Sequence, residues 1–149
     1  MLGVDRSAIV DANWCDNGPR WIGVQLADAE AVLALRPNFG VGEGTGVGVV
    51  GPDTIGAVGL TGAGDPDEPA IEVRAFFSSA GQPAEDPVTG SLNAGLAQWL
   101  LGNGTLSGAY VASQGTALGR AGRVHITPDA DVIWVGGDAV TCVAGTVQL

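Results

Sequence analysis

The sequence predicts an α+β fold in which a β-sheet wraps around one central, buried helix. Two observations support this prediction. Glycine supplies 25 of the 149 residues, and glycine at that density between valine, threonine and isoleucine is typical of short strands joined by tight turns. The segment from Ser91 to Leu101 has helical spacing and is apolar nearly all round, so we expect it to be buried on nearly every side.

The spacing of large apolar residues predicts the central helix itself. They recur at positions i, i+4, i+7 and i+8, namely Leu92, Leu96, Trp99 and Leu100. The Gly102-Asn103-Gly104 step that follows favours the left-handed backbone that ends a helix. We therefore predict a helix over residues 91–101 that is closed by this turn.

Shorter patterns predict the elements that precede the central helix. Residues 20–26 favour a strand, and a helix follows them, capped by Asp28 and ended by Pro37. Residues 46–62 favour two strands around a Pro52-Asp53 turn, and residues 64–69 form an acidic loop. Residues 70–77 alternate as a strand does, with Glu72 and Arg74 on one face and the apolar side chains on the other: Ile71, Val73, Ala75 and Phe77.

The remainder of the chain favours further strands and gives no sign of a second unit. These strands are predicted over residues 109–113, 123–127, 132–136 and 139–149. The four tryptophans are interpreted as packing anchors, and His125 as an ordinary strand residue. The sequence has no internal repeat and no linker, so we expect one domain over residues 1–149.

Charge and hydropathy exclude several classes of partner. The formal net charge is -10, which repels phosphate backbones, so neither nucleic acid nor an anionic membrane is an expected partner. No apolar run reaches the length of about 18–20 residues that spans a bilayer. Asp5 lies where a signal peptide would have its apolar region. We therefore expect a cytoplasmic protein.

Neither a metal nor a cofactor is expected. Cys15 and Cys142 lie far apart without a C-x-x-C spacing, and the chain has one histidine, so two buried thiols are predicted rather than a disulfide or a metal site. Residues 46–51 match G-x-G-x-x-G, but Pro52-Asp53 and a predicted strand follow where a dinucleotide site needs a helix.

The start of the central helix is the candidate functional site. A helix begins with unpaired N–H groups and a dipole that favours an anion. Gly90 would let a ligand approach this backbone closely, Ser91 adds a hydroxyl, and Asp86 just upstream could move a proton. Alternatively, Asp86 serves only as a helix cap, which Asp-Pro often does, and Glu85 is solvated surface.

The segment "EDPVTGS", residues 85–91, followed by an apolar helix, resembles the signature of the PhzF-like isomerases of phenazine biosynthesis. That family shares its fold with diaminopimelate epimerase. The resemblance covers essentially the whole chain. Its motifs are specific for the family when they are taken together, and each is moderately specific when taken alone. The other segments that carry it are residues 18–38, 72–77, 113–126, 133–137 and 143–149. It implies a strongly curved, mostly antiparallel, barrel-like sheet around the central helix.

The resemblance also implies roles for single residues. The chain is similar to the C-terminal half of a family member alone, and the family's main acid/base glutamate and a Gly-His motif belong to the other half. Asp86 resembles the family's second active-site carboxylate, while Gly90 and Ser91 resemble the residues that hold the acid group of the substrate. Thr89 lies where the epimerases have a catalytic cysteine, and Asn93 replaces a histidine often found two residues after the serine.

Two functions from different classes follow from this resemblance. The first is a cofactor-independent isomerase or epimerase that acts on a small carboxylate-bearing molecule, with Asp86 as the catalytic residue. Its substrate-binding residues would be Thr89, Gly90, Ser91 and Asn93. It would need a homodimer or a separate N-terminal half to complete the site. The second is a non-catalytic half-protein that serves as a small-molecule-binding or assembly module.

Overall fold

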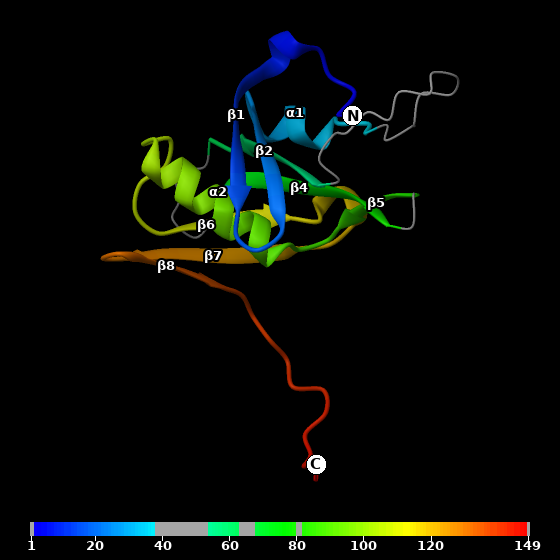
Figure 1. Ribbon diagram of the computed structural model, residues 1–149, viewed down its shortest axis with the longest axis vertical. Coiled ribbons are helices and arrows are strands. Elements are labelled where there is room, and N and C mark those ends of the chain that lie inside the picture. The colour runs from blue at the N-terminus through cyan, green and yellow to red at the C-terminus, as the bar shows by residue number, and fades with distance from the viewer. Residues whose placement is uncertain (1, 38–53, 63–67, 80–81, 149) are drawn as a thin grey trace.

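The computed structural model describes residues 2–37, 54–62, 68–79 and 82–148 (Figure 1). The first of the two strands predicted within residues 46–62, the Pro52-Asp53 turn and the motif at residues 46–51 lie outside these ranges, as does most of the acidic loop.

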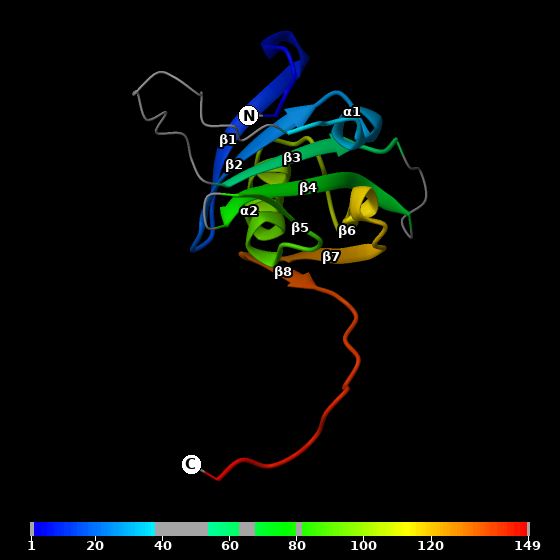
Figure 2. The same cartoon turned by 90° about the vertical axis from the view of Figure 1, so that its right-hand side faces the viewer.

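One curled sheet dominates the described residues (Figure 2). Its central path runs β1-β2-β3-β4-β6-β7-β8, and β5 pairs with β4 alone. Only the β2–β3 and β4–β6 pairs are parallel among the strand pairs of the described residues, so the prediction of a mostly antiparallel, strongly curved sheet is confirmed. The strands are β1 (Ile9–Asp16), β2 (Arg20–Leu26), β3 (Thr54–Leu60), β4 (Pro69–Ser79), β5 (Gln82–Asp86), β6 (Tyr110–Gln114), β7 (Gly122–Asp129) and β8 (Val132–Gly136).

The central helix, α2 (Gly90–Gly102), lies within the curve of the sheet, as predicted (Figure 2). Leu92 and Leu96 are fully buried in the core that α2 shares with the strands. Gly95 allows α2 to approach β1 closely, because a Cβ added there would lie 2.7 Å from the Cβ of Cys15 on β1. The helix ends in the predicted turn, where Gly104 has the left-handed φ of 78°.

A second, smaller core covers the outer face of the sheet. The short helix α1 (Ala29–Leu33) is capped as predicted, because the Asp28 side chain accepts a hydrogen bond from the N–H of Ala31 at 2.8 Å. Val32 and Phe76 are buried in this core. β4 is therefore covered on both faces, and its outward residues Glu72 and Arg74 are buried as well.

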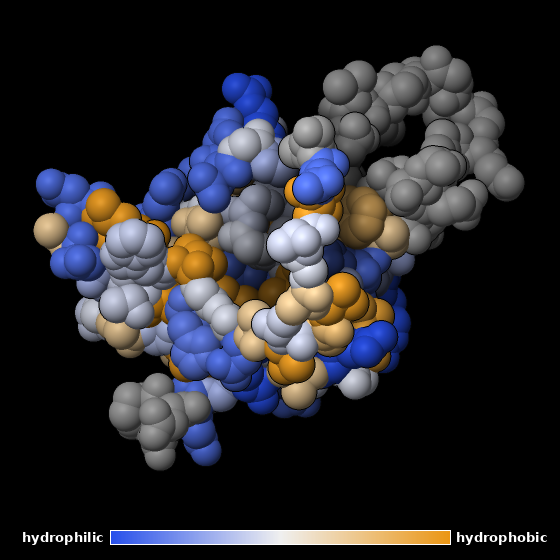
Figure 3. Space-filling view, turned by 90° about the horizontal axis from the view of Figure 1, so that it is seen from below, coloured by the Kyte–Doolittle hydropathy of each residue, from blue (hydrophilic) through white to orange (hydrophobic). Residues whose placement is uncertain are grey.

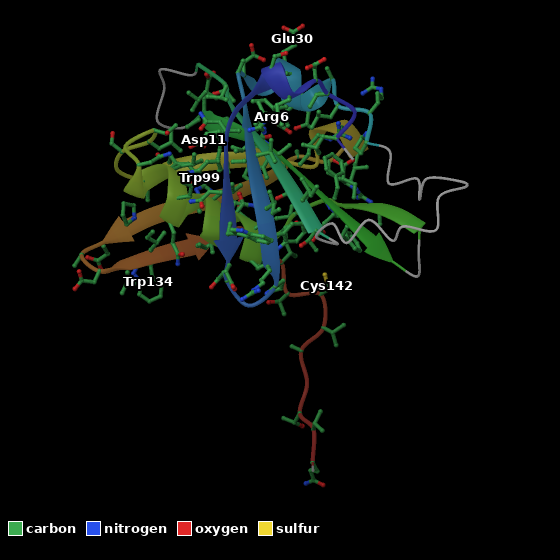
Figure 4. All side chains as sticks on the ribbon, turned by 45° about the horizontal axis from the view of Figure 1, so that its top comes forward. Arg6, Asp11, Glu30, Trp99, Trp134 and Cys142 are labelled. Carbon is green, nitrogen blue, oxygen red and sulfur yellow. The ribbon has the colours of Figure 1, made fainter. Side chains whose placement is uncertain are left out.

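The predicted strand over residues 139–149 is wrong for the residues described there. Residues 137–148 are extended but pair with no strand of the described chain, and they project away from the sheet (Figure 1). The valines of this segment are not buried against an apolar surface, and the exposed fraction of Val143 reaches 90%. Cys142 lies on this tail and is exposed rather than buried (Figure 4). A valine-rich alternating pattern indicates a strand only where a partner edge is present.

Only half of the tryptophans act as packing anchors. Trp21 and Trp99 are buried in the core around α2. Trp14 is 59% exposed and Trp134 is 62% exposed. Both exposed rings belong to the strands at the two ends of the sheet, β1 and β8, each of which has a neighbouring strand of the described chain on one side only. Figure 4 shows Trp134 on β8.

Membrane crossing by a helix finds no support in the structure. Within the described ranges, no helix combines the length and the apolar character that crossing a bilayer requires.

Candidate functional site

The segment before α2 is organised by one buried glutamine. Gln114, at the end of β6, has no exposed surface. Its Oε1 accepts hydrogen bonds from the N–H of Thr89 at 3.0 Å and from Nδ2 of Asn93 at 2.8 Å. Its Nε2 donates to the carbonyl of Asp86 at 2.9 Å and to Oγ1 of Thr89 at 3.0 Å. All hydrogen-bonding positions of this amide are therefore used by the segment of residues 86–93, two by its backbone and two by its side chains.

Asp86 is half-buried and does not cap the helix. The N-cap residue of α2 is Thr89, and the Thr89 hydroxyl donates to Oδ2 of Asp86 at 2.9 Å instead of serving the helix. The interpretation of Asp86 as only a cap is therefore wrong. Oδ1 of Asp86 has no hydrogen-bond partner among the residues that the structure describes, so one carboxylate oxygen is available to a ligand.

Glu85 holds the strand that carries Asp86. The guanidinium of Arg74 donates to both oxygens of Glu85, at 2.9 and 2.7 Å. The two side chains are 7% and 13% exposed, so the expectation of a solvated Glu85 is wrong. Arg74 also donates to the carbonyl of Leu35 at 2.9 Å, just after α1. The ion pair therefore ties β5 and the neighbouring Asp86 to β4 and to the outer core.

The first turn of α2 presents donors without partners. None of the N–H groups of Gly90, Ser91 and Leu92 makes a hydrogen bond within the described part of the chain. Ser91 Oγ accepts a hydrogen bond from Nε1 of Trp21 at 3.1 Å, which leaves the Ser91 hydroxyl proton free to donate. A Cβ at Gly90 would meet nothing within 4 Å, so the space beside this turn is open.

A cavity of about 450 Å³ begins at this turn and runs along the exposed side of α2. Its volume lies within the range of small-molecule sites. Of the five predicted site residues, only Gly90 lines it. The other lining residues come from α2, from β8 and from the turns on either side: Asn17, Ala94, Gln98, Asp131, Ile133 and Val135. No sequence pattern marks Asn17 or Asp131 as a site residue, because each is an ordinary polar residue in a turn.

Asn93 lies behind the turn rather than in the cavity. It is 1% exposed, and its Nδ2 donates to the carbonyl of Thr89 at 2.9 Å as well as to Gln114. Its Oδ1 is buried without a partner among the described residues. Thr89 is also buried, so the structure brings these two residues into the support of the helix start.

Neither a metal centre nor a reactive thiol is found near this site. No group of three or more histidine, cysteine, aspartate or glutamate residues that could hold a metal occurs in residues 2–37, 54–62, 68–79 and 82–148. Burial raises the pKa of the Cys15 thiol, which disfavours the nucleophilic thiolate.

The fold and site together define a class of protein in which a curved sheet encloses a helix whose first turn, beside a carboxylate, faces open space. The chain belongs to the PhzC-PhzF family of phenazine biosynthesis-like proteins, whose model matches residues 2–145.

Individual relatives agree with this assignment. The chain is 31% identical over 138 residues to antisense-enhancing sequence 1 of Schizosaccharomyces pombe, covering 87% of this chain and 44% of that protein. It is 26% identical over 146 residues to an uncharacterized isomerase of Pasteurella multocida, covering 97% of this chain and 47% of the isomerase.

A solved structure shows the same fold. The crystal structure of the Bacillus anthracis phenazine biosynthesis protein of the PhzF family aligns with a TM-score of 0.63 at 18% identity, covering 87% of this chain and 46% of that one. The chain therefore spans about half the length of the relatives that it matches.

Proposed function

We propose that this chain is an isomerase or epimerase domain that transfers a proton on a small carboxylate-bearing molecule without a cofactor. The observation that carries the proposal is the free oxygen of Asp86 on the same short segment as the unpaired N–H groups of α2. Family membership and the relative named as an isomerase support this class of reaction. A role in a biosynthetic step in the cytoplasm is part of the same proposal.

The first turn of α2 would hold the acid group of the substrate. Its N–H groups and the positive end of the helix dipole favour a carboxylate. The Ser91 hydroxyl would donate a further hydrogen bond, since Trp21 already occupies it as an acceptor. The rigid frame of Gln114 and Thr89 keeps these donors fixed, which lowers the cost of ordering them around a ligand.

Asp86 would move the proton. Oδ2 is held by Thr89, so Oδ1 would take a proton from the substrate carbon or return one to it. A shift or inversion at carbon needs one group to remove the proton and another to supply it. The second group would come from a second copy or from a separate half, because Asp86 is the only carboxylate among the five predicted site residues, and Asp131 lines the cavity from the turn between β7 and β8 instead.

Two features support a partner of this kind. The sheet ends in two edge strands, β1 and β8, whose exposed residues include Trp14 and Trp134. Apolar surface is also visible on the face from which the C-terminal tail projects (Figure 3), and Val140, Val143 and Val147 of that tail are exposed. Exposed apolar groups gathered on edges and an extended tail are typical of surfaces that a partner covers.

Deuterium exchange tests the catalytic part of the proposal. We expect the protein to incorporate deuterium from D₂O at the α-carbon of a small carboxylate from a panel of such molecules. Asp86→Asn should slow this exchange by about a hundredfold or more, as loss of a general acid/base does. Asp129→Asn, an exposed carboxylate at the end of β7, is the matched control. Equal exchange by both variants, or exchange by none of the proteins, rules out the proposed role of Asp86.

Binding is tested separately by NMR titration with acetate. The amides of Gly90 and Ser91 should shift first, because they carry the unpaired N–H groups. Shifts confined to distant amides would place the anion site elsewhere. The second candidate function, a non-catalytic binding or assembly module, is favoured by the exposed edge strands, and it predicts acetate binding without any exchange.

A further inference from the structure

A row of polar side chains crosses the outer face of the sheet, away from α2. Glu72 of β4 pairs in register with Ser113 of β6, and Ser113 pairs with Arg123 of β7. Because successive residues of a strand point to opposite faces, these three side chains face away from the core around α2. The residues beside them along the strands belong to that core: Ile71, Val73, Ala112 and Val124.

The row is continued by a directed chain of hydrogen bonds. Nη1 of Arg123 donates to Oγ of Ser113 at 3.0 Å. Oγ of Ser113 lies 3.2 Å from Oγ1 of Thr116, which in turn donates to Oε2 of Glu72 at 3.1 Å. The hydroxyls of Ser113 and Thr116 therefore lie between the positive charge of Arg123 and the negative charge of Glu72. No direct ion pair joins Arg123 and Glu72 among those of the described residues.

Glu72 is left with an unused oxygen. Its side chain belongs to a residue that is only 4% exposed, and Oε1 is buried with no hydrogen-bond partner in the described chain. Burial raises the pKa of Glu72, against the opposing influence of the Ser113 and Thr116 hydroxyls and of Arg123 and Arg74. A buried, unpaired carboxylate oxygen costs free energy, so this oxygen lacks a donor that a ligand would supply.

The same residues line an open cleft of about 720 Å³. Glu68, an exposed second acid, lies at the cleft, and Arg123 uses only Nη1 in hydrogen bonds to described residues. The guanidinium therefore keeps Nε and Nη2 available. Thr61, Gly62 and Pro69 complete the lining. The cleft thus offers acceptors at its Glu72 end and donors at its Arg123 end.

We propose that this cleft binds a small zwitterion of the α-amino acid class, with its ammonium group on the carboxylate of Glu72, which lines the cleft, and its carboxylate on Arg123. A simple cation would leave Arg123 without a counter-ion, and a simple anion would leave Glu72 and Glu68 without one. A molecule with both charges matches both ends. The cleft is separate from the candidate active site, because none of residues 86–93 lines it.

NMR titration with glycine tests the proposal, with methylammonium and acetate as probes of its two ends. Glycine should shift the amides of Ser113, Thr116 and Arg123. Each of the two single-charge probes should bind at least tenfold more weakly, because charge-assisted hydrogen bonds form at both ends. Glycine shifts confined to Gly90 and Ser91 would assign the ligand to the candidate active site and overturn the proposal. Equal affinity for acetate or for methylammonium would overturn the zwitterion class.

Matched variants test the two anchoring residues. Glu72→Gln keeps the side-chain shape, and Arg123→Gln removes an exposed charge, so both proteins should fold, which thermal melts check. Each should weaken glycine binding at least tenfold, while Arg120→Gln, an exposed arginine outside the cleft lining, should leave it unchanged. Unchanged glycine affinity in Glu72→Gln or Arg123→Gln overturns the proposal. This outcome is independent of whether acetate binds at the start of α2.

Discussion

At the scale of single residues, Gln114 links the strand β6 to the start of α2. Its amide binds the segment from Asp86 to Asn93 through four hydrogen bonds. Asp86 and the first turn of α2 are therefore held by one buried side chain, and not by a helix cap. The geometry of the candidate site depends on a residue that touches no solvent.

Replacing Gln114 should damage the fold as well as the site. Gln114→Ala leaves the Thr89 N–H and the Asp86 carbonyl without their partners and opens a cavity, so we expect a loss of about 2–5 kcal/mol in the free energy of unfolding. Denaturant melts measure it. Gln98→Ala, on the exposed side of α2, should change stability by less than about 0.5 kcal/mol. A loss below about 1 kcal/mol in Gln114→Ala would contradict a structural role for the network.

Glu72 gives a prediction for the pH dependence of stability. Its pKa is raised from an ordinary value of 4.5 in the folded chain, mainly by burial. Between the unfolded and the folded pKa, the folded state therefore holds a proton that the unfolded state has lost. The stability supplied by this group falls as pH rises from about 4.5 through the folded pKa.

Glu72→Gln removes this titration. The difference in the free energy of unfolding between Glu72→Gln and wild type should grow in favour of the variant as pH rises through that window. Urea melts at several values between about pH 4 and about pH 8 measure it. The other carboxylates cancel in the difference, and a difference that is flat with pH would show that Glu72 titrates normally.

At the scale of elements, the close approach of α2 and β1 depends on Gly95. A Cβ there would lie 2.7 Å from the Cβ and 3.0 Å from the Cα of Cys15, and a backbone atom of a paired strand cannot move aside freely. The same substitution at Gly102, near the end of α2, would meet nothing within 4 Å. Alanine substitutions at the two glycines can therefore distinguish the effect of packing on stability from the effect of helix propensity.

Gly95→Ala should lower the free energy of unfolding by about 1–3 kcal/mol through overpacking. Gly102→Ala should leave stability unchanged or raise it by up to about 1 kcal/mol, because alanine favours a helix over glycine. Thermal and denaturant melts of the two variants compare these effects directly. If Gly95→Ala is as stable as Gly102→Ala, the contact between α2 and β1 is looser than the structure shows.

The elements differ in how far the sequence could predict them. β2 and β8 have the predicted bounds, and α2 extends the predicted helix by one residue at each end. The apolar patterns of β2 and α2 reflect burial, whereas β8 has no buried residue and follows only a run of strand-forming residues. β1 was missed because Cys15 is its only buried residue, so backbone pairing holds it without an apolar pattern. β5 was missed because it contains Pro83 and two acids, one of which is stabilised by Arg74 of the paired strand β4.

The candidate site was predictable to a similar degree. The start of α2, with Asp86 before it, follows from local sequence, and so does the availability of its first N–H groups. The roles of Gln114 and Arg74 do not, because both residues contact this segment only once their strands, β6 and β4, have taken their places in the folded sheet. Asp131 reaches the cavity beside Gly90 for the same reason.

At the scale of the whole molecule, several apolar surfaces lack a partner. The sheet ends at β1 and β8 with exposed Trp14 and Trp134, and an extended tail carries exposed valines away from it. These features belong to a chain that spans about half of its relatives. A second copy that covers one end of the sheet would bury such surfaces, and a two-fold arrangement would let each chain do the same for the other.

We therefore predict that the chain forms a homodimer that depends on the tail. Sedimentation at micromolar concentration should give the mass of two chains. Val143 and Val147 are 90% and 82% exposed in the single chain. If a second copy covers these two side chains, Val143→Asp combined with Val147→Asp buries two charges and should shift the protein to the monomer. Thr146→Asp replaces an exposed residue that is already polar and should leave the dimer intact. A monomer mass for the unmodified chain would exclude the homodimer, and a separate N-terminal half would then be the partner that the proposed reaction needs. A dimer that survives the double substitution would place the contact between the chains on the edge strands rather than on the tail.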